Sequence, residues 1–161
     1  MTHRFTCRVY YEDTDFAGIV YYANYLRFIE RARTEWVRTL GIDQGRLRDE
    51  TGVVFAVRRV EADYLVPARF DDLLTVETVV EEVRGARIVV VQTVLRNGAR
   101  LFTARVTLAA VTSGGRPARL PAVLRAAAGS APRYRLRGTG WHGVKPKAPC
   151  RRMAVPAAVR H

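Results

Sequence analysis

The amino-acid sequence predicts an α+β domain in which an antiparallel sheet curls around a single long helix. Only one segment of the 161-residue chain has long helical periodicity. One strand-like segment precedes that helix, and four follow it. The connections between the four later strands are too short for the crossovers that parallel neighbours require, so these strands should be antiparallel. The chain length suits one domain with a single core.

Hydrophobic spacing predicts the first strand and the helix. Apolar residues at every second position indicate a half-buried strand from Phe5 to Tyr11. From Tyr22 to Leu40 the apolar spacing changes to that of a helix. Gly41 is the expected stop signal, and Asn24 or a neighbouring residue is the expected cap. A polar loop is expected after Gly41.

Four further strands are predicted in the second half of the domain. Asn97-Gly98 is a strong hairpin signal because both positions need positive φ, and Arg84-Gly85 marks another hairpin. The strands are therefore expected to form an antiparallel meander, and Pro121 to Ala128 could add one short closing helix. In the last strand, alternate residues from Phe102 to Ala110 share one apolar face. The predicted strands are roughly Val53 to Tyr64, Leu73 to Val83, Ala86 to Leu95 and Leu101 to Val111.

The net charge of +12 is concentrated near the C-terminal end. Residues 1–128 hold 19 Arg and all 15 acidic residues, a net +4, whereas residues 129–161 hold six Arg and two Lys without any acid, a net +8. We therefore predict one domain over residues 1–128 and a basic, disordered tail over residues 129–161. Because the tail has no recognition motif, and G- and C-rich coding enriches Arg, no nucleic-acid partner is expected.

Cysteine usage and hydropathy favour a cytoplasmic protein. Cys7 and Cys150 match no zinc or redox spacing, and the three histidines are isolated, so neither a disulfide framework nor a metal site is expected. No stretch approaches the roughly 20 apolar residues of a membrane span. The residues from Met1 to Phe5 also lack the apolar region of a signal peptide.

The segment between the first strand and the helix combines a carboxylate, a flexible turn and backbone donors. Asp15 lies in a predicted loop, and Gly18 lets the backbone turn or a ligand approach closely. Backbone N–H groups at Tyr21 and Tyr22, beside a helix N-terminus, could stabilise an oxyanion. This combination suits attack on a thioester, with Asp15 as nucleophile or general base. Asp15 could instead be a turn former, and Asp13 competes for the catalytic role.

The same segment resembles the signature of a known family. From Arg8 to Tyr25 the chain reads Arg-Val-Tyr-Tyr-Glu-Asp-Thr-Asp-Phe-Ala-Gly-Ile-Val-Tyr-Tyr-Ala-Asn-Tyr, which is similar to the 4-hydroxybenzoyl-CoA thioesterase family. From Glu30 it reads Glu-Arg-Ala-Arg-Thr-Glu-Trp, which resembles the YbgC-like branch of acyl-CoA thioesterases linked to the Tol-Pal envelope system. The resemblance covers about residues 5–128. Further matching segments are Ala62 to Arg69, Asp71 to Leu74 and Gly115 to Pro117.

The resemblance implies a hotdog fold, in which an antiparallel five-stranded sheet wraps around one long central helix. It also implies a homodimer or homotetramer with sites at subunit boundaries. The implied enzyme hydrolyses an acyl-CoA thioester to a free carboxylic acid and coenzyme A without a cofactor. Asp15 matches the family's catalytic carboxylate, Gly18 the turn glycine, and Tyr22 the residue whose backbone N–H polarises the carbonyl. The YbgC-like branch usually has His at the position of Tyr22, so only the backbone role is carried over.

Neighbouring residues are candidate contacts for the two parts of an acyl-CoA. Gly18, Val20, Tyr21 and Tyr25 could line an acyl pocket, although an aromatic stripe at helical spacing is usually core. For the phosphates of coenzyme A we select Arg59 among three candidates. The three are Arg58, Arg59 and Arg69.

Two alternatives qualify this functional prediction. Glu30, on the helix, could serve as base or nucleophile, but its arginine neighbours favour an ion-paired or interface role. A non-catalytic hotdog module that binds acyl-CoA would share the fold and the pocket without needing Asp15.

Overall fold

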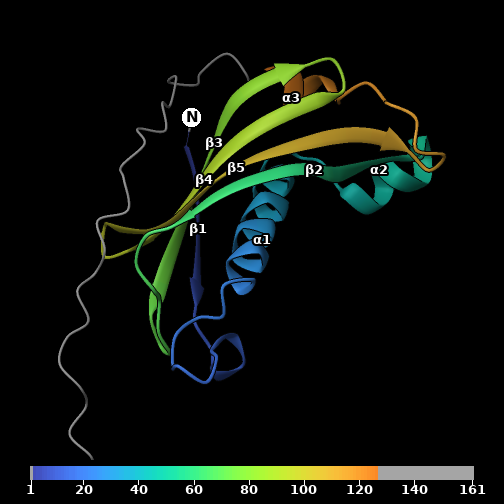
Figure 1. Cartoon of the computed structure of the whole chain (residues 1–161). Helices are drawn as coiled ribbons and strands as arrows, with labels where there is room; N and C mark the ends of the chain where they lie inside the picture. The colour runs from blue at the N-terminus through green and yellow to red at the C-terminus, as the bar shows by residue number, and fades with distance from the viewer. Residues whose placement is uncertain (1, 127–161) are drawn as a thin grey trace, which may run out of the picture.

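The computed structural model describes residues 2–126, in which a curved five-stranded antiparallel sheet wraps around helix α1 (Figure 1). The strand order across the sheet is β1-β3-β4-β5-β2. Along the chain the elements are β1 (Thr2–Arg8), a 3₁₀ helix η1 (Tyr11–Asp13), α1 (Asn24–Thr39), α2 (Gln44–Thr51), β2 (Val53–Tyr64), β3 (Leu73–Arg84), β4 (Arg87–Arg96), β5 (Ala99–Thr112) and α3 (Ala122–Ala126).

The pairing of β2 corrects the predicted meander. β3, β4 and β5 do follow one another through hairpins, and Asn97 and Gly98 both have positive φ at the second turn. β2, however, pairs with β5, and β1 takes the place beside β3. Residues 65–72 carry the chain from the edge strand β2 across to β3, which lies beside the opposite edge strand β1. Periodicity cannot reveal this crossing because it reports burial and not pairing partners.

The first strand ends earlier than predicted because a side chain captures its next backbone donor. The N–H of Val9 still bonds to the carbonyl of Asp72 at 3.0 Å, but the N–H of Tyr10 donates to Oδ2 of Asp13 at 2.8 Å. The chain then turns through η1, and the side chain of Tyr11 is 83% exposed where the alternation predicted an inward position. The strand prediction is therefore wrong beyond Arg8.

Helix α1 packs its apolar stripe against the concave face of the sheet. Phe28, Ile29, Ala32 and Trp36 are buried along that stripe. The helix stops as predicted at Gly41, whose φ is 77°, and its N–H bonds to the carbonyl of Arg38 while the N–H of Ile42 bonds to that of Val37.

Asn24 does not cap α1; the neighbouring residue takes the N-cap position, as the second predicted option allowed. Ala23 occupies the N-cap position and makes no side-chain cap bond. Asn24 instead donates through Nδ2 to the carbonyl of Asp13 at 3.0 Å and is buried. Leu26, an apolar residue within the predicted helical pattern, is 40% exposed. These differences arise at the end of α1 that meets the preceding loop, where tertiary contacts outweigh local preference.

Helix α2 replaces the expected polar loop. Asp43 caps it by accepting a hydrogen bond from the N–H of Arg46 at 3.0 Å, and Gly52 closes it in the left-handed conformation. None of its residues is buried, so it has no apolar stripe that the sequence could display. Capping and ion pairs such as that of Arg46 with Glu50 hold it instead.

The predictions for the four later strands agree with the structure to within two residues, and β2 has the predicted bounds. The alternate β5 residues from Phe102 to Ala110 form the predicted buried face. Beneath α1 this core includes a polar group in which Arg33 donates to Gln92, and Gln92 donates to Thr78 and to the carbonyl of Ile29.

α3 corresponds to the described part of the predicted closing helix, and Leu124 inserts from it into the core. The predicted boundary at residue 128 and the predicted tail over residues 129–161 lie outside the described residues. No described helix is long and apolar enough to cross a membrane.

Candidate active site

A pocket of about 330 Å³ opens where the loop before α1 meets the end of β2. Four of the predicted site side chains, those of Asp15, Val20, Tyr21 and Tyr25, line it together with Tyr22. Gly18 lies in the adjoining turn but not among the lining residues, and Arg59 lies elsewhere on β2. The full lining consists of Asp15, Ile19, Val20, Tyr21, Tyr22, Tyr25, Tyr64, Leu65, Val66 and Pro67.

A tight turn presents Asp15 at the pocket. The N–H of Asp15 bonds to the carbonyl of Ile19 and the N–H of Gly18 bonds to the carbonyl of Asp15, both at 2.9 Å. Gly18 has φ of 71°, a conformation that favours glycine. The N–H of Ala17 donates to Oδ1 of Asp15 at 2.9 Å, so the carboxylate also stabilises its own turn. Within residues 2–126, Oδ2 has no recorded donor and is free to face a ligand.

Asp13 has a structural position that separates it from Asp15. It is only 3% exposed and is absent from the pocket lining. Its Oδ2 accepts the N–H of Tyr10, and its carbonyl accepts both the N–H of Tyr21 and Nδ2 of Asn24. The geometry therefore favours Asp15 over Asp13 as the carboxylate that meets a substrate.

Tyr22 carries the available backbone donor. The N–H of Tyr21 is bonded to the carbonyl of Asp13 at 2.9 Å, and the N–H of Asn24 to the carbonyl of Tyr21 at 2.8 Å. In the described part of the chain, no acceptor is recorded for the N–H of Tyr22. Of the two donors that the sequence suggested, Tyr21 is thus already used and Tyr22 remains available for a ligand oxygen.

Tyrosine rings line the pocket, and the ring of Phe102 packs against two of them. The ring of Tyr25 stacks on Phe102 with centroids 5.1 Å apart, and its hydroxyl accepts the N–H of Ala68 at 2.8 Å. Burial raises the pKa of Tyr25 above its usual value. A hydrogen bond with the side chain of Tyr22 is the main cause that raises the pKa of Tyr21. Both hydroxyls therefore stay protonated at neutral pH.

Tyr64 is a pocket residue that the sequence analysis did not select. It is the last residue of β2, and its hydroxyl donates to the carbonyl of Tyr22 at 3.0 Å. Its ring contacts those of Tyr22, Tyr25 and Phe102. The only sequence signal was its place within the matching segment from Ala62 to Arg69, which suggested no role for its side chain.

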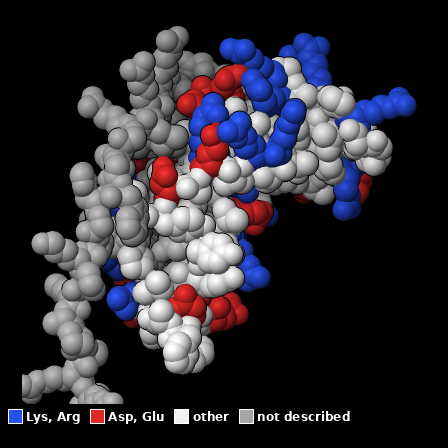
Figure 2. Space-filling view, in the orientation of Figure 1, with Lys and Arg blue, Asp and Glu red and all other residues white. Residues whose placement is uncertain are grey.

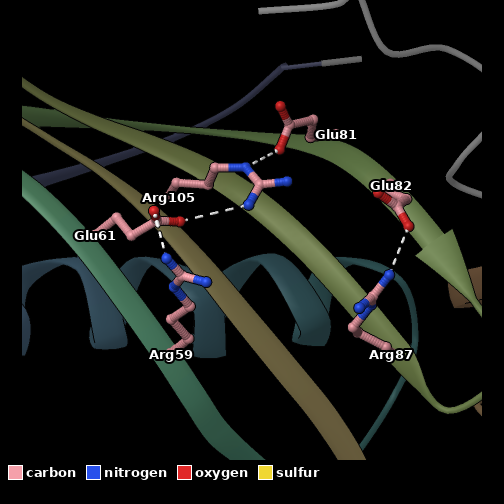
Figure 3. A network of polar contacts seen from close by, with 6 residues as sticks. All are labelled: Arg59, Glu61, Glu81, Glu82, Arg87 and Arg105. Atoms are coloured by element: carbon pink, nitrogen blue, oxygen red, sulfur yellow. Dashed lines mark hydrogen bonds and ion pairs between the residues drawn. The ribbon is translucent and has the colours of Figure 1, made fainter. Parts of the chain in front are cut away.

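Arg59 lies in a charged network on the sheet and not at the pocket (Figure 3). Its Nη2 donates to Glu61 at 2.9 Å, while Arg105 bonds to Glu81 at 2.6 Å and approaches Glu61 at 3.5 Å. A contact between Arg59 and coenzyme A therefore stays a prediction. Arg69 is closer to the pocket, because it forms an isolated β-bridge with the lining residue Ile19.

The end of the molecule that holds the pocket is poor in basic side chains on the face shown in Figure 2. Blue side chains gather instead over α2 and the neighbouring end of the sheet, and the end with the loop before α1 is mostly uncharged with a few acidic residues. Large apolar side chains are exposed there, including Phe16 at 110% and Tyr22 at 62%. This surface suits the acyl part of a substrate better than its phosphates.

Glu30 makes no ion pair among the described residues, which corrects the ion-paired alternative. Its carboxylate accepts the hydroxyl of Thr34 at 2.8 Å, and it lines a separate cavity of about 110 Å³ beside Arg33 and Trp36. Glu30 is therefore absent from the pocket that contains Asp15. Within residues 2–126, no three His, Cys, Asp or Glu side chains are grouped to hold a metal ion.

Comparison with known proteins identifies the family. Residues 9–128 match the family model of the thioesterase-like superfamily. The chain belongs to the thioesterase-like superfamily. Among curated relatives of this thioesterase-like chain, acyl-CoA thioesterase YbgC of Haemophilus influenzae is 48% identical over 124 residues, which cover 76% of this chain and 91% of the relative. This similarity agrees with the resemblance to the YbgC-like branch.

Solved structures agree with this assignment and confirm the hotdog fold. A probable thioesterase from Bartonella henselae is 40% identical to this thioesterase-like chain, with a TM-score of 0.72, covering 75% of this chain and all of the other. A variant of 4-hydroxybenzoyl-CoA thioesterase bound to 4-hydroxybenzoyl-CoA is 25% identical, with a TM-score of 0.73, covering 79% of this chain and 98% of the other.

Proposed function

We propose that this thioesterase-like protein hydrolyses an acyl-CoA thioester to a carboxylic acid and coenzyme A. The observation that carries the proposal is the meeting of the Asp15 carboxylate and the unbonded N–H of Tyr22 at one pocket. The similarity to an acyl-CoA thioesterase over 91% of its length supports the substrate class. An acyl group would enter the tyrosine-lined pocket, and the nucleotide part would lie outside it.

The N–H of Tyr22 would stabilise the negative charge that forms on the thioester oxygen as its carbon becomes tetrahedral. Asp15 would act in one of two ways. As general base, it removes a proton from water, whose oxygen bonds to the carbonyl carbon before the C–S bond breaks. As nucleophile, its free oxygen attacks the carbon and forms an anhydride with loss of the thiolate, and water then cleaves that anhydride. In both routes the departing thiolate takes up a proton.

The second candidate is a non-catalytic module that binds acyl-CoA. One observation favours it: the hydrogen bond from Ala17 gives Asp15 a structural reason to be present without catalysis. Both candidates predict that acyl-CoA occupies the pocket. Only the enzyme also predicts that free thiol is released.

A thiol-release assay with the full chain separates the two candidates. Short, medium, long and aromatic acyl-CoAs are incubated with the protein, and free coenzyme A is quantified by chromatography so that protein thiols do not contribute. Release that is proportional to protein concentration supports the enzyme. Tight binding of acyl-CoA without release for any substrate would support the binding module.

We also propose that the protein forms a homodimer or homotetramer. Among the described residues, β2 pairs with β5 on one side only. Its other edge therefore has unpaired backbone groups there, beside exposed apolar side chains such as Val57 and Val60. The pocket adjoins the end of this edge strand. Sedimentation velocity of the wild type and of Val57→Lys tests the proposal, which predicts a dimer or tetramer that the substitution weakens.

For location and partners we propose the cytoplasm and a functional link to the Tol-Pal envelope system. The unpaired thiol of Cys7 is consistent with a reducing compartment, and the Tol-Pal link rests on the resemblance to the YbgC-like branch. Fractionation with a tagged chain, followed by co-purification of envelope proteins, tests both. Recovery in an extracytoplasmic fraction would contradict the first.

A further inference from the structure

Tyr64 joins the sheet to the peptide between Tyr22 and Ala23, which directly follows the peptide that carries the proposed oxyanion donor. Its hydroxyl donates to the carbonyl of Tyr22 at 3.0 Å across 42 residues of sequence. Tyr64 is itself fixed in the β-ladder, where it pairs with Phe102, a fully buried residue of β5. The donor segment before α1 is therefore tied to the opposite wall of the same pocket.

The hydrogen bonds around Tyr22 make this tie specific. The N–H of Tyr21 bonds to Asp13, and the carbonyl of Tyr21, which shares a peptide unit with the donor N–H of Tyr22, accepts the N–H of Asn24. Tyr22 follows without such backbone bonds: in residues 2–126 its N–H has no recorded acceptor, and its carbonyl has the hydroxyl of Tyr64 as its recorded donor. The direction of the peptide after Tyr22 thus depends on one side chain.

We propose that Tyr64 is a positioning residue, which fixes the peptide after Tyr22 and thereby supports the preceding peptide, whose N–H points to the thioester oxygen. This inference rests on the proposed function. An oxyanion donor contributes most when its direction is set before the reaction, because no reorganisation is then needed as charge develops. Tyr64 supplies that constraint without touching the reacting atoms.

The surroundings of Tyr64 suit a fixed donor. Its ring lies 5.0 Å from that of Phe102 and 5.7 Å from that of Tyr25, both in edge-to-face geometry. Burial is the main cause that raises the pKa of Tyr64, with a smaller contribution from Tyr22. The hydroxyl therefore remains protonated, and able to donate, throughout the pH range of an enzyme assay.

Tyr64→Phe removes the hydroxyl and keeps the ring, and Tyr11→Phe is the matched control because that side chain is 83% exposed and outside the pocket. We expect Tyr64→Phe to lower kcat by about tenfold while KM stays within about twofold, since a misdirected donor affects the transition state more than substrate binding. Thermal unfolding is measured for both variants. A kcat equal to that of the control, or a change in KM alone, would overturn the proposal.

Amide hydrogen exchange provides the readout that does not depend on turnover. In Tyr64→Phe, the amide of Asn24, which bonds to the carbonyl of the donor peptide at 2.8 Å, should exchange faster than in wild type and in Tyr11→Phe, while amides in the middle of α1 should be unchanged. Unchanged exchange at Asn24 would overturn the positioning role even if kcat fell. If the wild type releases no thiol from any acyl-CoA, the proposed function fails, and the exchange measurement still decides whether Tyr64 holds the Tyr22 peptide.

Discussion

Asn24, in the first turn of α1, donates its side-chain amide to the backbone carbonyl of Asp13 at 3.0 Å. The same carbonyl accepts the N–H of Tyr21, so Asp13 links the end of the first strand to the start of the helix. Both Asn24 and Asp13 are buried. This relationship assigns the first Asp of the Asp-Thr-Asp group to structure and leaves the second to face the pocket.

Asp13→Ala should therefore destabilise the fold. The substitution removes the acceptor for the N–H of Tyr10 and leaves that donor partly buried without a partner. We expect the free energy of unfolding, measured by urea titration, to fall by about 1–3 kcal/mol. Glu12→Ala, an exposed neighbour, is the control and should stay close to wild type. Equal stability of the two variants would contradict the structural role of Asp13.

Tyr22→Phe should preserve most activity. The side chain of Tyr22 is 62% exposed, and the role inferred for this residue belongs to its backbone N–H, which the substitution retains. We expect kcat for a reactive acyl-CoA to change by less than about threefold. A loss of a hundredfold or more would show that the tyrosine hydroxyl takes part in the chemistry and that the backbone assignment is incomplete.

Arg33→Met tests the polar group beneath α1. Arg33 is 9% exposed and donates from Nη1 to Oε1 of Gln92 at 2.7 Å. The substitution leaves the buried amide oxygen of Gln92 without this hydrogen-bond donor, which should lower the free energy of unfolding by about 1–3 kcal/mol. Arg31→Met changes an exposed arginine of the same helix and serves as the control. Stability above that of the control would indicate that burying the guanidinium costs more than its hydrogen bond contributes.

The thiol of Cys7 should react slowly. Burial raises its pKa from 9.0 to about 11, with Arg31 opposing the shift. In a Cys150→Ser background at pH 8, we expect alkylation of the folded protein to be about a hundredfold slower than that of the urea-unfolded chain, because the thiolate is the reactive form. Equal rates would contradict the buried environment.

The same shift has a consequence for stability with a defined sign. Between the unfolded value of 9.0 and the folded value of about 11, the unfolded chain loses the Cys7 proton and the folded chain keeps it. The unfolded state then binds fewer protons, so the contribution of Cys7 to stability is present below pH 9 and is lost as the pH rises toward 11. Replacement by Ser should reduce this loss in urea titrations between pH 8 and pH 11.

Burial patterns explain which elements could be predicted. β5 alternates between a buried and a less buried face, and α1 has an apolar stripe, so both have a periodic signal. α2 has no buried residue and could be found only from Asp43 and Gly52 at its ends. The place of β2 beside β5 depends on how residues 65–72 cross the sheet, which leaves no periodic trace.

The candidate site could be predicted where its proposed residues belong to one continuous segment. Asp15, Gly18 and Tyr22 belong to that segment, and the family resemblance assigned them roles together. Tyr64 was missed because its contact with Tyr22 joins residues 42 positions apart. The pairing of Arg59 with Glu61 could be predicted more easily from the sequence, since residues two apart on a strand share one face.

The turnover of Asp15→Asn is the most direct test of the proposed chemistry. Asn is nearly isosteric with Asp and keeps an oxygen that can accept the N–H of Ala17, so the turn should persist and thermal unfolding should match wild type. Steady-state release of coenzyme A from the best wild-type substrate is then compared between the two proteins. We predict a fall in kcat of at least about a thousandfold, since both the base and the nucleophile routes need the carboxylate. Activity within about tenfold of wild type in a folded Asp15→Asn protein would contradict the assignment of Asp15.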